Sequence, residues 1–311
     1  KIKNLCLAGG VALNCVVNGL IVKEKIFEKI WIQPAAGDAG GALGAALAFW
    51  HMNLKKERNV SKDDNMNGSY LGPNFKQKEI KQALDKIGAK YSIINRKKLL
   101  SKVAYHLSKG KAVGWFQGRM EFGPRALGAR SIIADPRSPD MQKKLNLKIK
   151  YRESFRPFAP SILCEDLSEW FDLNSYSPYM LLVADININK RFPISSKDKD
   201  LFGINKLNIP RSFTPAITHV DYSARVQTVH PETNDRYYKL ISKFKEVTGC
   251  PILVNTSFNI RGEPIICSPT DAFNCFMGTE LDVLVIENYY LIKEKQKVIF
   301  KKGYQNQYEL D

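Results

Sequence analysis

The residues best suited to chemistry are concentrated in one stretch, residues 115–137, with the sequence WFQGRMEFGPRALGARSIIADPR. Among its glycines and prolines stand four arginines, Arg119, Arg125, Arg130 and Arg137. Arginine offers a planar fork of donors that fits phosphate and carboxylate oxygens, and glycine lets backbone N–H groups approach a ligand closely. The composition therefore predicts an anion-binding site. A solvated, salt-bridged loop would account for any one of these arginines alone.

A glycine pair near the start of the chain has the order of a phosphate-binding turn. The apolar strand expected over residues 5–8 runs into Gly9 and Gly10, and the apolar spacing of residues 11–30 predicts a helix. A strand, a glycine turn and a helix are one recurring way of binding nucleotide phosphates. The pair is a weak signal by itself.

Within residues 37–51, Asp38 lies in a Gly-Asp-Ala-Gly-Gly turn that precedes a helix of small residues. Its carboxylate could ligate a metal or accept hydrogen bonds as the N-terminal cap of that helix. The sequence alone favours the cap.

A third group of polar residues ends an apolar strand expected over 251–259. Asn255, Thr256, Ser257 and Asn259 follow the apolar residues of this strand. Short hydroxyl and amide side chains at such a place are suited to a loop that faces a ligand, although they also cap turns.

The elements that must position these groups fall into two parts. Residues 1–55 contain two strand–helix units, too few to close a stable α/β sheet, and residues 56–70 are polar and are expected to form a linker. Beyond residue 70 helices and strands mix without regular alternation, which predicts an α+β domain over 71–311. We expect helices at 78–89, 96–110, from 141, at 234–249 and 269–278, strands at 111–116, 155–163, 177–186, 218–230 and 281–292, and a polar insertion at 186–210.

The composition is that of an ordinary globular protein with an excess of positive charge. The 311 residues are 44% hydrophobic and 25% charged, with a net charge of +16. No apolar run approaches the roughly 20 residues of a membrane span. The six cysteines form no CxxC pair and mostly lie in apolar segments, so we expect reduced thiols and a cytoplasmic protein. The charge also admits a basic RNA-binding module, although scattered lysines on amphipathic helices explain much of it.

Six ordered blocks of the sequence resemble the O-carbamoyltransferase family, which includes nodulation-factor and antibiotic carbamoyltransferases. The blocks are GGVALNCVVNG, GDAGGALGAAL, GRMEFGPRALGARSIIADPR, ESFRPFAPSIL, HVDYSARVQTV and NTSFNIRGEPIICSPTDAFNCFMGTELD. They span most of the chain.

The resemblance implies a fold and an activity. Residues 1–55 would be the C-terminal part of an actin-like ATPase (ASKHA) domain, and residues 71–311 would resemble threonylcarbamoyl-AMP synthase. In similar enzymes the second domain converts carbamoyl phosphate and ATP, with Mg²⁺, into carbamoyl-adenylate and releases phosphate and pyrophosphate. The first domain then transfers the carbamoyl group to a substrate hydroxyl with the help of a divalent, iron-type metal.

The resemblance also implies site residues. In the second domain the anion site would fall on Arg119, Arg125, Arg130, Lys150, Arg152, Arg156 and Arg225, while Asn255, Ser257 and Asn259 would face the carbamoyl or adenylate group. In the first domain Gly9, Gly10 and Asn14 would lie near adenylate, and Asp38 would ligate the metal.

One feature of the family is missing from the sequence. The family's metal site also uses an upstream His-x-x-x-His pair, and the four histidines, His51, His106, His219 and His230, do not have that spacing. We therefore expect an incomplete chain whose actin-like domain is completed by an upstream segment or a second chain, or else a homodimer. The acceptor hydroxyl is not readable from the sequence, and we expect neither a membrane partner nor a nucleic-acid partner.

Overall fold

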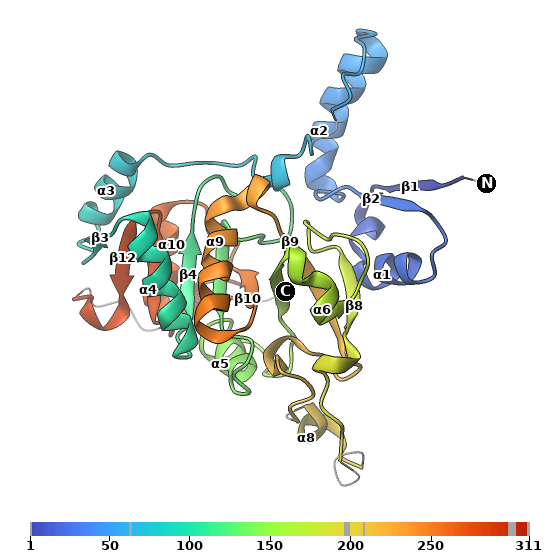
Figure 1. Ribbon diagram of the computed structural model, residues 1–311. Helices are drawn as coiled ribbons and strands as arrows, with labels where there is room; N and C mark the ends of the chain where they lie inside the picture. The colour runs from blue at the N-terminus through green and yellow to red at the C-terminus, as the bar shows by residue number, and fades with distance from the viewer. Residues whose placement is uncertain (1, 62–63, 196–199, 208, 298–302, 310–311) are drawn as a thin grey trace.

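The structure is a computed structural model that describes residues 2–61, 64–195, 200–207, 209–297 and 303–309. Figure 1 shows one large body built on a sheet, with a smaller N-terminal unit beside it. Within the described ranges, no helix is both long enough and apolar enough to cross a bilayer.

Ten strands of the described residues form the large sheet. Their order is β3 (Ser92–Ile93), β12 (Tyr289–Ile292), β11 (Val283–Ile286), β4 (Val113–Phe116), β5 (Arg130–Ala134), β10 (Ile252–Ser257), β6 (Ala159–Leu163), β9 (Ser223–Val229), β8 (Leu182–Ile186) and β7 (Phe171–Asp172). The pairs β11–β4 and β6–β9 are parallel, and the other pairs are antiparallel. This mixed sheet confirms the expected α+β class.

Helices cover the sheet, and local sequence signals set several of their ends. The helices of this body are α3 (Gln77–Lys86), α4 (Arg96–Ser108), α5 (Met141–Lys148), α6 (Leu167–Trp170), α8 (Gly203–Leu207), α9 (Pro231–Thr248) and α10 (Pro269–Gly278). Ser268 and Asp271 form a capping box that begins α10, and Gly249 ends α9 in the left-handed conformation. In Figure 1, α4 and α9 lie side by side, and these two helices pack against each other.

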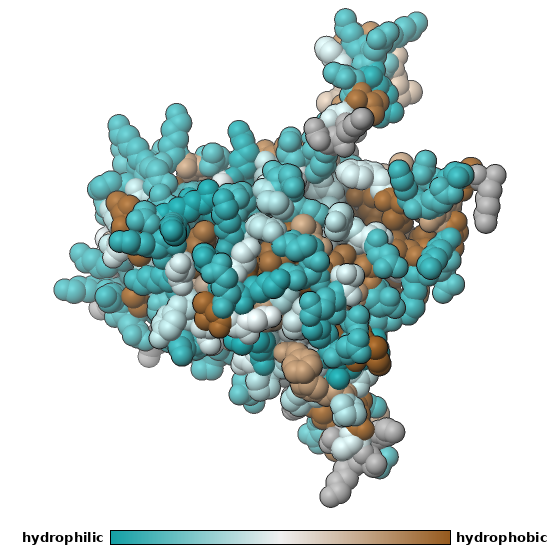
Figure 2. Space-filling model, in the orientation of Figure 1, coloured by the Kyte–Doolittle hydropathy of each residue, from teal (hydrophilic) through white to brown (hydrophobic). Residues whose placement is uncertain are grey.

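The N-terminal unit has a sheet of its own. Strand β1 (Asn4–Leu7) pairs in parallel with β2 (Lys29–Ile32), and α1 (Cys15–Lys23) connects them. Helix α2 (Asp38–Ala48) and a π-helical turn, η2 (Phe49–Asn53), project away from the body (Figure 1), and α2 has no buried residue. Figure 2 shows apolar side chains on the surface of this unit, and those exposed include Val11, Val16, Leu20, Phe49 and Trp50.

Helix α1 docks the N-terminal unit on strand β8. The buried side chain of Asn18 donates from Nδ2 to the Leu181 carbonyl at 3.1 Å, and Lys23 forms an ion pair with Asp185 at 2.8 Å. At Gly19 a Cβ atom would lie 2.2 Å from the Val183 carbonyl oxygen, so only glycine allows this approach.

Residues 64–70, which fall in the expected linker, pack on the body. Ser69 Oγ donates to the Phe122 carbonyl at 2.5 Å, and Tyr70 Oη donates to the Leu127 carbonyl at 2.7 Å. These bonds fasten the segment to the arginine-rich stretch.

Three sequence predictions of elements were wrong in detail. The strand expected over 281–292 is the hairpin β11–β12, which turns at Glu287 with a positive φ of 49°. The helix expected over 11–30 is the shorter α1, preceded by a 3₁₀ turn at Gly10–Leu13. The polar insertion at 186–210 contains a 3₁₀ turn at Ile188–Lys190 and the short α8, and its residues 196–199 and 208 lie outside the described residues.

Candidate functional site

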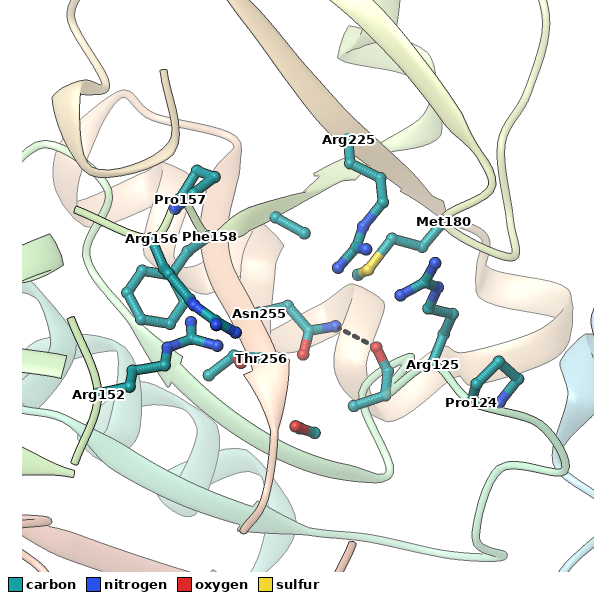
Figure 3. A pocket seen from close by; sticks show the side chains of 13 residues that line it. Pro124, Arg125, Arg152, Arg156, Pro157, Phe158, Met180, Arg225, Asn255 and Thr256 are labelled. Atoms are coloured by element: carbon teal, nitrogen blue, oxygen red, sulfur yellow. Dashed lines mark hydrogen bonds between the residues drawn. The ribbon is translucent and has the colours of Figure 1, made fainter. Parts of the chain in front are cut away.

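Two adjoining cavities open where the central strands of the sheet end. The first, which we call the arginine cavity, has a volume of about 370 Å³ and is lined by Pro124, Arg125, Ala126, Arg152, Arg156, Pro157, Phe158, Ala159, Met180, Arg225, Asn255, Thr256 and Ser257 (Figure 3). The second, the lysine cavity, has a volume of about 430 Å³ and is lined by Lys150, Arg152, Arg156, Ser257, Asn259, Ile260, Arg261, Gly262, Glu263 and Pro264. Arg152, Arg156 and Ser257 belong to both.

The strand order explains why distant residues meet here. Strands β10 and β9 flank β6, so Asn255 on β10 and Arg225 on β9 lie on either side of the segment that leads into β6. That segment carries Arg152 and Arg156, and Arg125 reaches the cavity from the loop between β4 and β5 (Figure 3).

Burial and mutual repulsion lower the pKa of two arginines in the arginine cavity. Burial, followed by the charge of Arg225, lowers the pKa of Arg125. Burial, followed by the charge of Arg156, lowers the pKa of Arg152 to about 10. Like charges gathered in a low-dielectric cavity cost free energy unless a negative charge joins them, so the arrangement favours an anion.

Two of these arginines have a buried N–H donor without a hydrogen-bond acceptor among the described residues. The Nε atoms of Arg125 and Arg225 are buried and have no hydrogen-bond partner among the described residues. The terminal nitrogen of Arg125 makes a long contact of 3.4 Å with the Leu13 carbonyl. Buried donors without partners are rare and costly. These two indicate a place for a ligand's oxygen atoms.

Asn255 supplies the opposite kind of group, an acceptor without a partner. The residue is 1% exposed, and its Nδ2 donates to Ala126 O at 3.1 Å (Figure 3), to Ser161 Oγ at 3.0 Å and to Gln227 Oε1 at 2.8 Å. Gln227 donates its own Nε2 to the Leu127 carbonyl at 2.8 Å, which leaves Gln227 Oε1 as the acceptor for Asn255. Asn255 Oδ1 has no partner among the described residues.

Lys150 dominates the lysine cavity, and its hydrogen bonds are fully used. Its Nζ lies 2.6 Å from Ser257 O, 3.1 Å from Ser257 Oγ, 2.8 Å from Asn259 O and 2.6 Å from Asn259 Oδ1. Burial, followed by the charge of Arg152, lowers the pKa of Lys150 to about 7. Lys150 is therefore close to the balance between ammonium and amine at neutral pH.

Two arginines predicted for the anion site lie elsewhere. Arg130 on β5 pairs with Phe116 on β4, and its fully buried guanidinium carbon lies 3.5 Å from the centre of the Phe116 ring. The guanidinium donates to the backbone carbonyls of Gln117, Gly118, Ala129 and Pro73. Arg119 is exposed and donates to the Gly72 carbonyl at 3.1 Å. Neither arginine lines the arginine cavity or the lysine cavity, because strand register and the course of the loop direct both side chains elsewhere.

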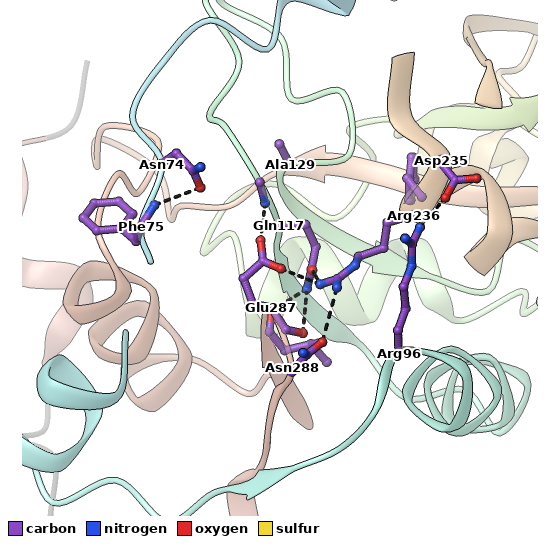
Figure 4. A network of polar contacts seen from close by, with 12 residues as sticks. Asn74, Phe75, Arg96, Gln117, Ala129, Asp235, Arg236, Glu287 and Asn288 are labelled. Atoms are coloured by element: carbon purple, nitrogen blue, oxygen red, sulfur yellow. Dashed lines mark hydrogen bonds and ion pairs between the residues drawn. The ribbon is translucent and has the colours of Figure 1, made fainter. Parts of the chain in front are cut away.

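Two carboxylates that the sequence analysis did not assign, the buried Glu121 and the half-buried Glu287, shape the arginine-rich loop. Glu121 Oε1 accepts from the backbone N–H groups of Leu127 at 2.6 Å and Ala129 at 2.8 Å, which folds the segment bearing Arg125. Glu287 fixes the loop's beginning by accepting from Gly118 N at 2.6 Å and from Arg236 at 2.6 Å (Figure 4). The sequence could have indicated the role of Glu121, because it is one of only two acidic residues within residues 115–137.

The glycine pair and Asn14 lie outside both cavities. Gly9 has a positive φ of 90°, and open space surrounds both Gly9 and Gly10. The side chain of Asn14 caps α1 by accepting from Val17 N at 3.2 Å. The neighbouring Leu13 carbonyl contacts Arg125, so this turn lies next to the arginine cavity.

Asp38 does not form a metal site with its described neighbours. It is exposed and is the first residue of α2, and the cap position is occupied by Gly37, so the capping interpretation was wrong by one residue. No group of three or more His, Cys, Asp or Glu residues with the geometry for a metal occurs in the described part of the chain. The described residues therefore do not form a complete metal site by themselves.

The fold is that of an α+β protein, and basic side chains line both of its adjoining cavities. Comparison with known proteins gives the family. A family model described as the C-terminus of carbamoyltransferases matches residues 104–293, and one described as their N-terminus matches residues 1–47. The chain belongs to the carbamoyltransferase family, which confirms the resemblance found in the sequence.

Several curated relatives share this region. An uncharacterised protein of Synechocystis is 59% identical over 100% of the chain and 51% of its own length. Nodulation protein NolNO of Sinorhizobium fredii is 41% identical over 94% of the chain and 40% of its own length, and nodulation protein U of Rhizobium fredii is 31% identical over 89% and 41%. The chain thus spans about half the length of the relatives it matches.

Proposed function

We propose that the two cavities form carbamoyl-adenylate from carbamoyl phosphate and ATP, and that the complete enzyme passes the carbamoyl group to a hydroxyl of a sugar or natural product. The observation that carries the proposal is that one cavity holds both donors and an acceptor that have no hydrogen-bond partner within the described part of the chain. Arg125 and Arg225 each present a buried Nε, and Asn255 presents a buried Oδ1.

Carbamoyl phosphate matches this set of groups. Its phosphate oxygens only accept hydrogen bonds at neutral pH and would pair with the arginines. Its amide carries N–H groups, which Asn255 Oδ1 would accept. A simple phosphate would leave the asparagine oxygen buried and unpaired, at a cost in binding.

The proposed reaction balances with one water. Water would attack the phosphorus of carbamoyl phosphate, so that its oxygen leaves in phosphate and carbamate remains. A carbamate oxygen would then attack the α-phosphorus of ATP, forming carbamoyl-adenylate as pyrophosphate leaves. Two polyanions must approach each other, and ATP would arrive with Mg²⁺ as its counter-ion. Fixed guanidinium groups of Arg152, Arg156 and Arg225 would offset the repulsion and stabilise charge on the departing phosphates.

The lysine cavity would hold the other substrate beside the first. Arg152, Arg156 and Ser257 line both cavities, so groups bound in the two would meet at these residues. Lys150, with its pKa lowered to about 7, is suited to exchange a proton near neutral pH. Asn259 would orient Lys150 through its Oδ1.

We further propose that residues 1–55 belong to the actin-like transfer domain and residues 71–311 to the threonylcarbamoyl-AMP synthase-like domain. Gly9 and Gly10 would then face the adenylate as it leaves the arginine cavity, because the adjacent Leu13 carbonyl lies 3.4 Å from Arg125. The hydroxyl-bearing acceptor and any transfer metal would bind with the rest of the transfer domain.

A convergent cavity also separates this proposal from the RNA-binding alternative. A nonspecific RNA surface would present its arginines as an exposed stripe with accessible aromatic rings. Here Arg125, Arg152 and Arg225 line one cavity with Phe158, whose ring is buried and lies 5.1 Å from the Arg152 guanidinium. This geometry supports a small-molecule site.

Pyrophosphate release tests the proposal. The purified chain is incubated with ATP and Mg²⁺, with and without carbamoyl phosphate, and the adenylate is sought by mass spectrometry. We expect release that depends on carbamoyl phosphate. Release at the same rate without carbamoyl phosphate, or no release from a folded protein together with salt-sensitive RNA binding, would overturn the proposal.

A further inference from the structure

We propose that the C-terminal segment 303–309 positions the loop that lines the lysine cavity, with Tyr304 and Tyr308 acting through Glu263. The segment contains the 3₁₀ turn Tyr304–Gln307, followed by Tyr308 and Glu309. These residues do not line either cavity. They act as positioning residues for groups that do.

Glu263 is the centre of the arrangement. Its carboxylate is buried, and both oxygens are occupied by donors. Oε1 accepts from the hydroxyl of Tyr304 and from that of Tyr308 at 3.2 Å, and Oε2 accepts from the backbone N–H of Ile260 at 2.8 Å. A buried carboxylate needs such donors, because it would otherwise bear the cost of leaving water.

From Glu263 a continuous chain of hydrogen bonds reaches Lys150. The Glu263 carbonyl accepts from Asn259 Nδ2 at 2.6 Å. Asn259 Oδ1 accepts in turn from Lys150 Nζ at 2.6 Å and from Ser257 Oγ at 2.7 Å. The orientation of the Asn259 amide, and with it the position of the Lys150 ammonium, therefore depends on where Glu263 holds the loop.

Close packing shows that the segment is fitted to the body. At Gly262, where φ is +78°, a Cβ atom would lie 2.4 Å from the Glu309 carbonyl oxygen, and at Gly278 a Cβ atom would lie 2.3 Å from the Tyr304 ring. Burial, followed by the bond to Glu263, raises the pKa of Tyr304, so its hydroxyl stays protonated and donates across the physiological range.

Losing the two hydroxyls would leave the packing in place and remove two donors from Glu263. The buried carboxylate would then draw in water or shift its loop, which loosens Asn259 and uncovers Lys150. We expect this change to lower the reaction rate, because a small misplacement of a positioned group reduces the rate by a large factor.

The test is the double variant Tyr304→Phe with Tyr308→Phe, and Tyr91→Phe is the matched control. Tyr91 also donates its hydroxyl to a carboxylate, Asp85 Oδ1 at 2.6 Å, and it lines neither cavity. Lys150 is labelled in competition with acetic anhydride over a range of pH and read by peptide mass spectrometry. We expect the double variant to label about five- to tenfold faster, the factor set by a typical hydrogen bond, and the control to stay within about twofold of wild type.

A second arm uses kinetics and rests on the proposed function. The kcat/KM for carbamoyl phosphate should fall between about 10- and 100-fold in the double variant and hold in Tyr91→Phe. If the wild type releases no pyrophosphate, the proposed function fails, while the labelling still decides this inference. If the double variant does not fold, Tyr308→Phe alone should still raise Lys150 labelling by about two- to fivefold. Unchanged Lys150 labelling in a folded variant would overturn the inference.

Discussion

The two adjoining cavities differ in how far their polar groups are already satisfied. In the arginine cavity the Nε atoms of Arg125 and Arg225 and the Oδ1 atom of Asn255 are buried without partners among the described residues. In the lysine cavity four oxygen atoms surround Lys150 Nζ. The first cavity therefore carries a cost in stability that a bound ligand would offset, whereas in the second the hydrogen bonds of Lys150 join parts of the protein to one another.

This difference teaches how to separate binding residues from positioning residues in a basic site. A count of positive charges would treat Arg225, Lys150 and Arg130 alike. Position and hydrogen bonding together separate them. The terminal nitrogens of Arg130 donate to four backbone carbonyls, and Lys150 donates to two residues. Arg225 lines the arginine cavity, and its buried Nε has no partner among the described residues. Substitutions should accordingly differ in their effect on stability, which loss of Lys150 should lower and loss of Arg225 should not.

Replacing the substrate gives the largest expected effect. Acetyl phosphate has the shape of carbamoyl phosphate, with a methyl group where the amide stands, so it would leave Asn255 Oδ1 buried and unpaired. We expect its kcat/KM to be lower by about 10⁴-fold, as in sites built to bind a substrate N–H. The rate of pyrophosphate release with each substrate measures this. Equal use of the two would show that Asn255 Oδ1 does not face the substrate.

Removing a binding arginine should reduce activity without reducing stability. We expect Arg225→Ala to lower kcat by about 10²- to 10³-fold, the typical cost of losing one donor to a transition state. Its melting temperature should hold or rise, because a buried unpartnered donor and a repulsion with Arg125 disappear. Arg96→Ala is the control, since Arg96 makes an exposed ion pair with Asp235. A stable fold with nearly full activity in Arg225→Ala would contradict the assignment.

Loss of Lys150, unlike loss of Arg225, should lower the stability of the protein. Lys150→Met keeps the length of the side chain but leaves the buried oxygens of Ser257 and Asn259 without their donor. We expect the free energy of unfolding to fall by about 2–4 kcal/mol. Urea denaturation of the wild type and the variant measures the difference. A variant as stable as the wild type would remove the distinction between the two cavities.

The pH dependence of stability offers the finest test of the same contrast. The folded state holds the pKa of Lys150 at about 7, below its ordinary value of 10.5. Between these values the unfolded chain binds the proton that the folded protein has released. We therefore compare the free energy of unfolding of the wild type with that of Lys150→Met. The difference, wild type minus variant, should rise with pH by up to ~1.4 kcal/mol per pH unit, starting near pH 7. A difference that does not change with pH would show that Lys150 keeps its ordinary pKa.

Local sequence signals were sufficient to predict most elements and part of the site. The strand that ends at Asn255 and Ser257, the helix stop at Gly249 and the arginine-rich loop all follow from residue types over short windows. Arg125, Arg152, Arg156 and Arg225, which the resemblance implied, do line one cavity.

What the sequence could not supply depends on strand order and register. Arg130 and Arg125 have the same chemistry and lie five positions apart, but Arg130 is opposite Phe116 in the sheet and is buried there. Glu263, Tyr304 and Tyr308 meet only because the chain's last described segment returns to the lysine cavity. No short window of sequence contains such a contact.

Equilibrium binding of carbamoyl phosphate tests the central claim most directly. Titration calorimetry compares the wild type, the double variant Arg125→Ala with Arg225→Ala, and Arg96→Ala. We predict one site in the wild type and in Arg96→Ala, and binding weakened by about 100-fold or more when both cavity arginines are lost. A double variant that is folded and binds carbamoyl phosphate as tightly as the wild type would contradict the account.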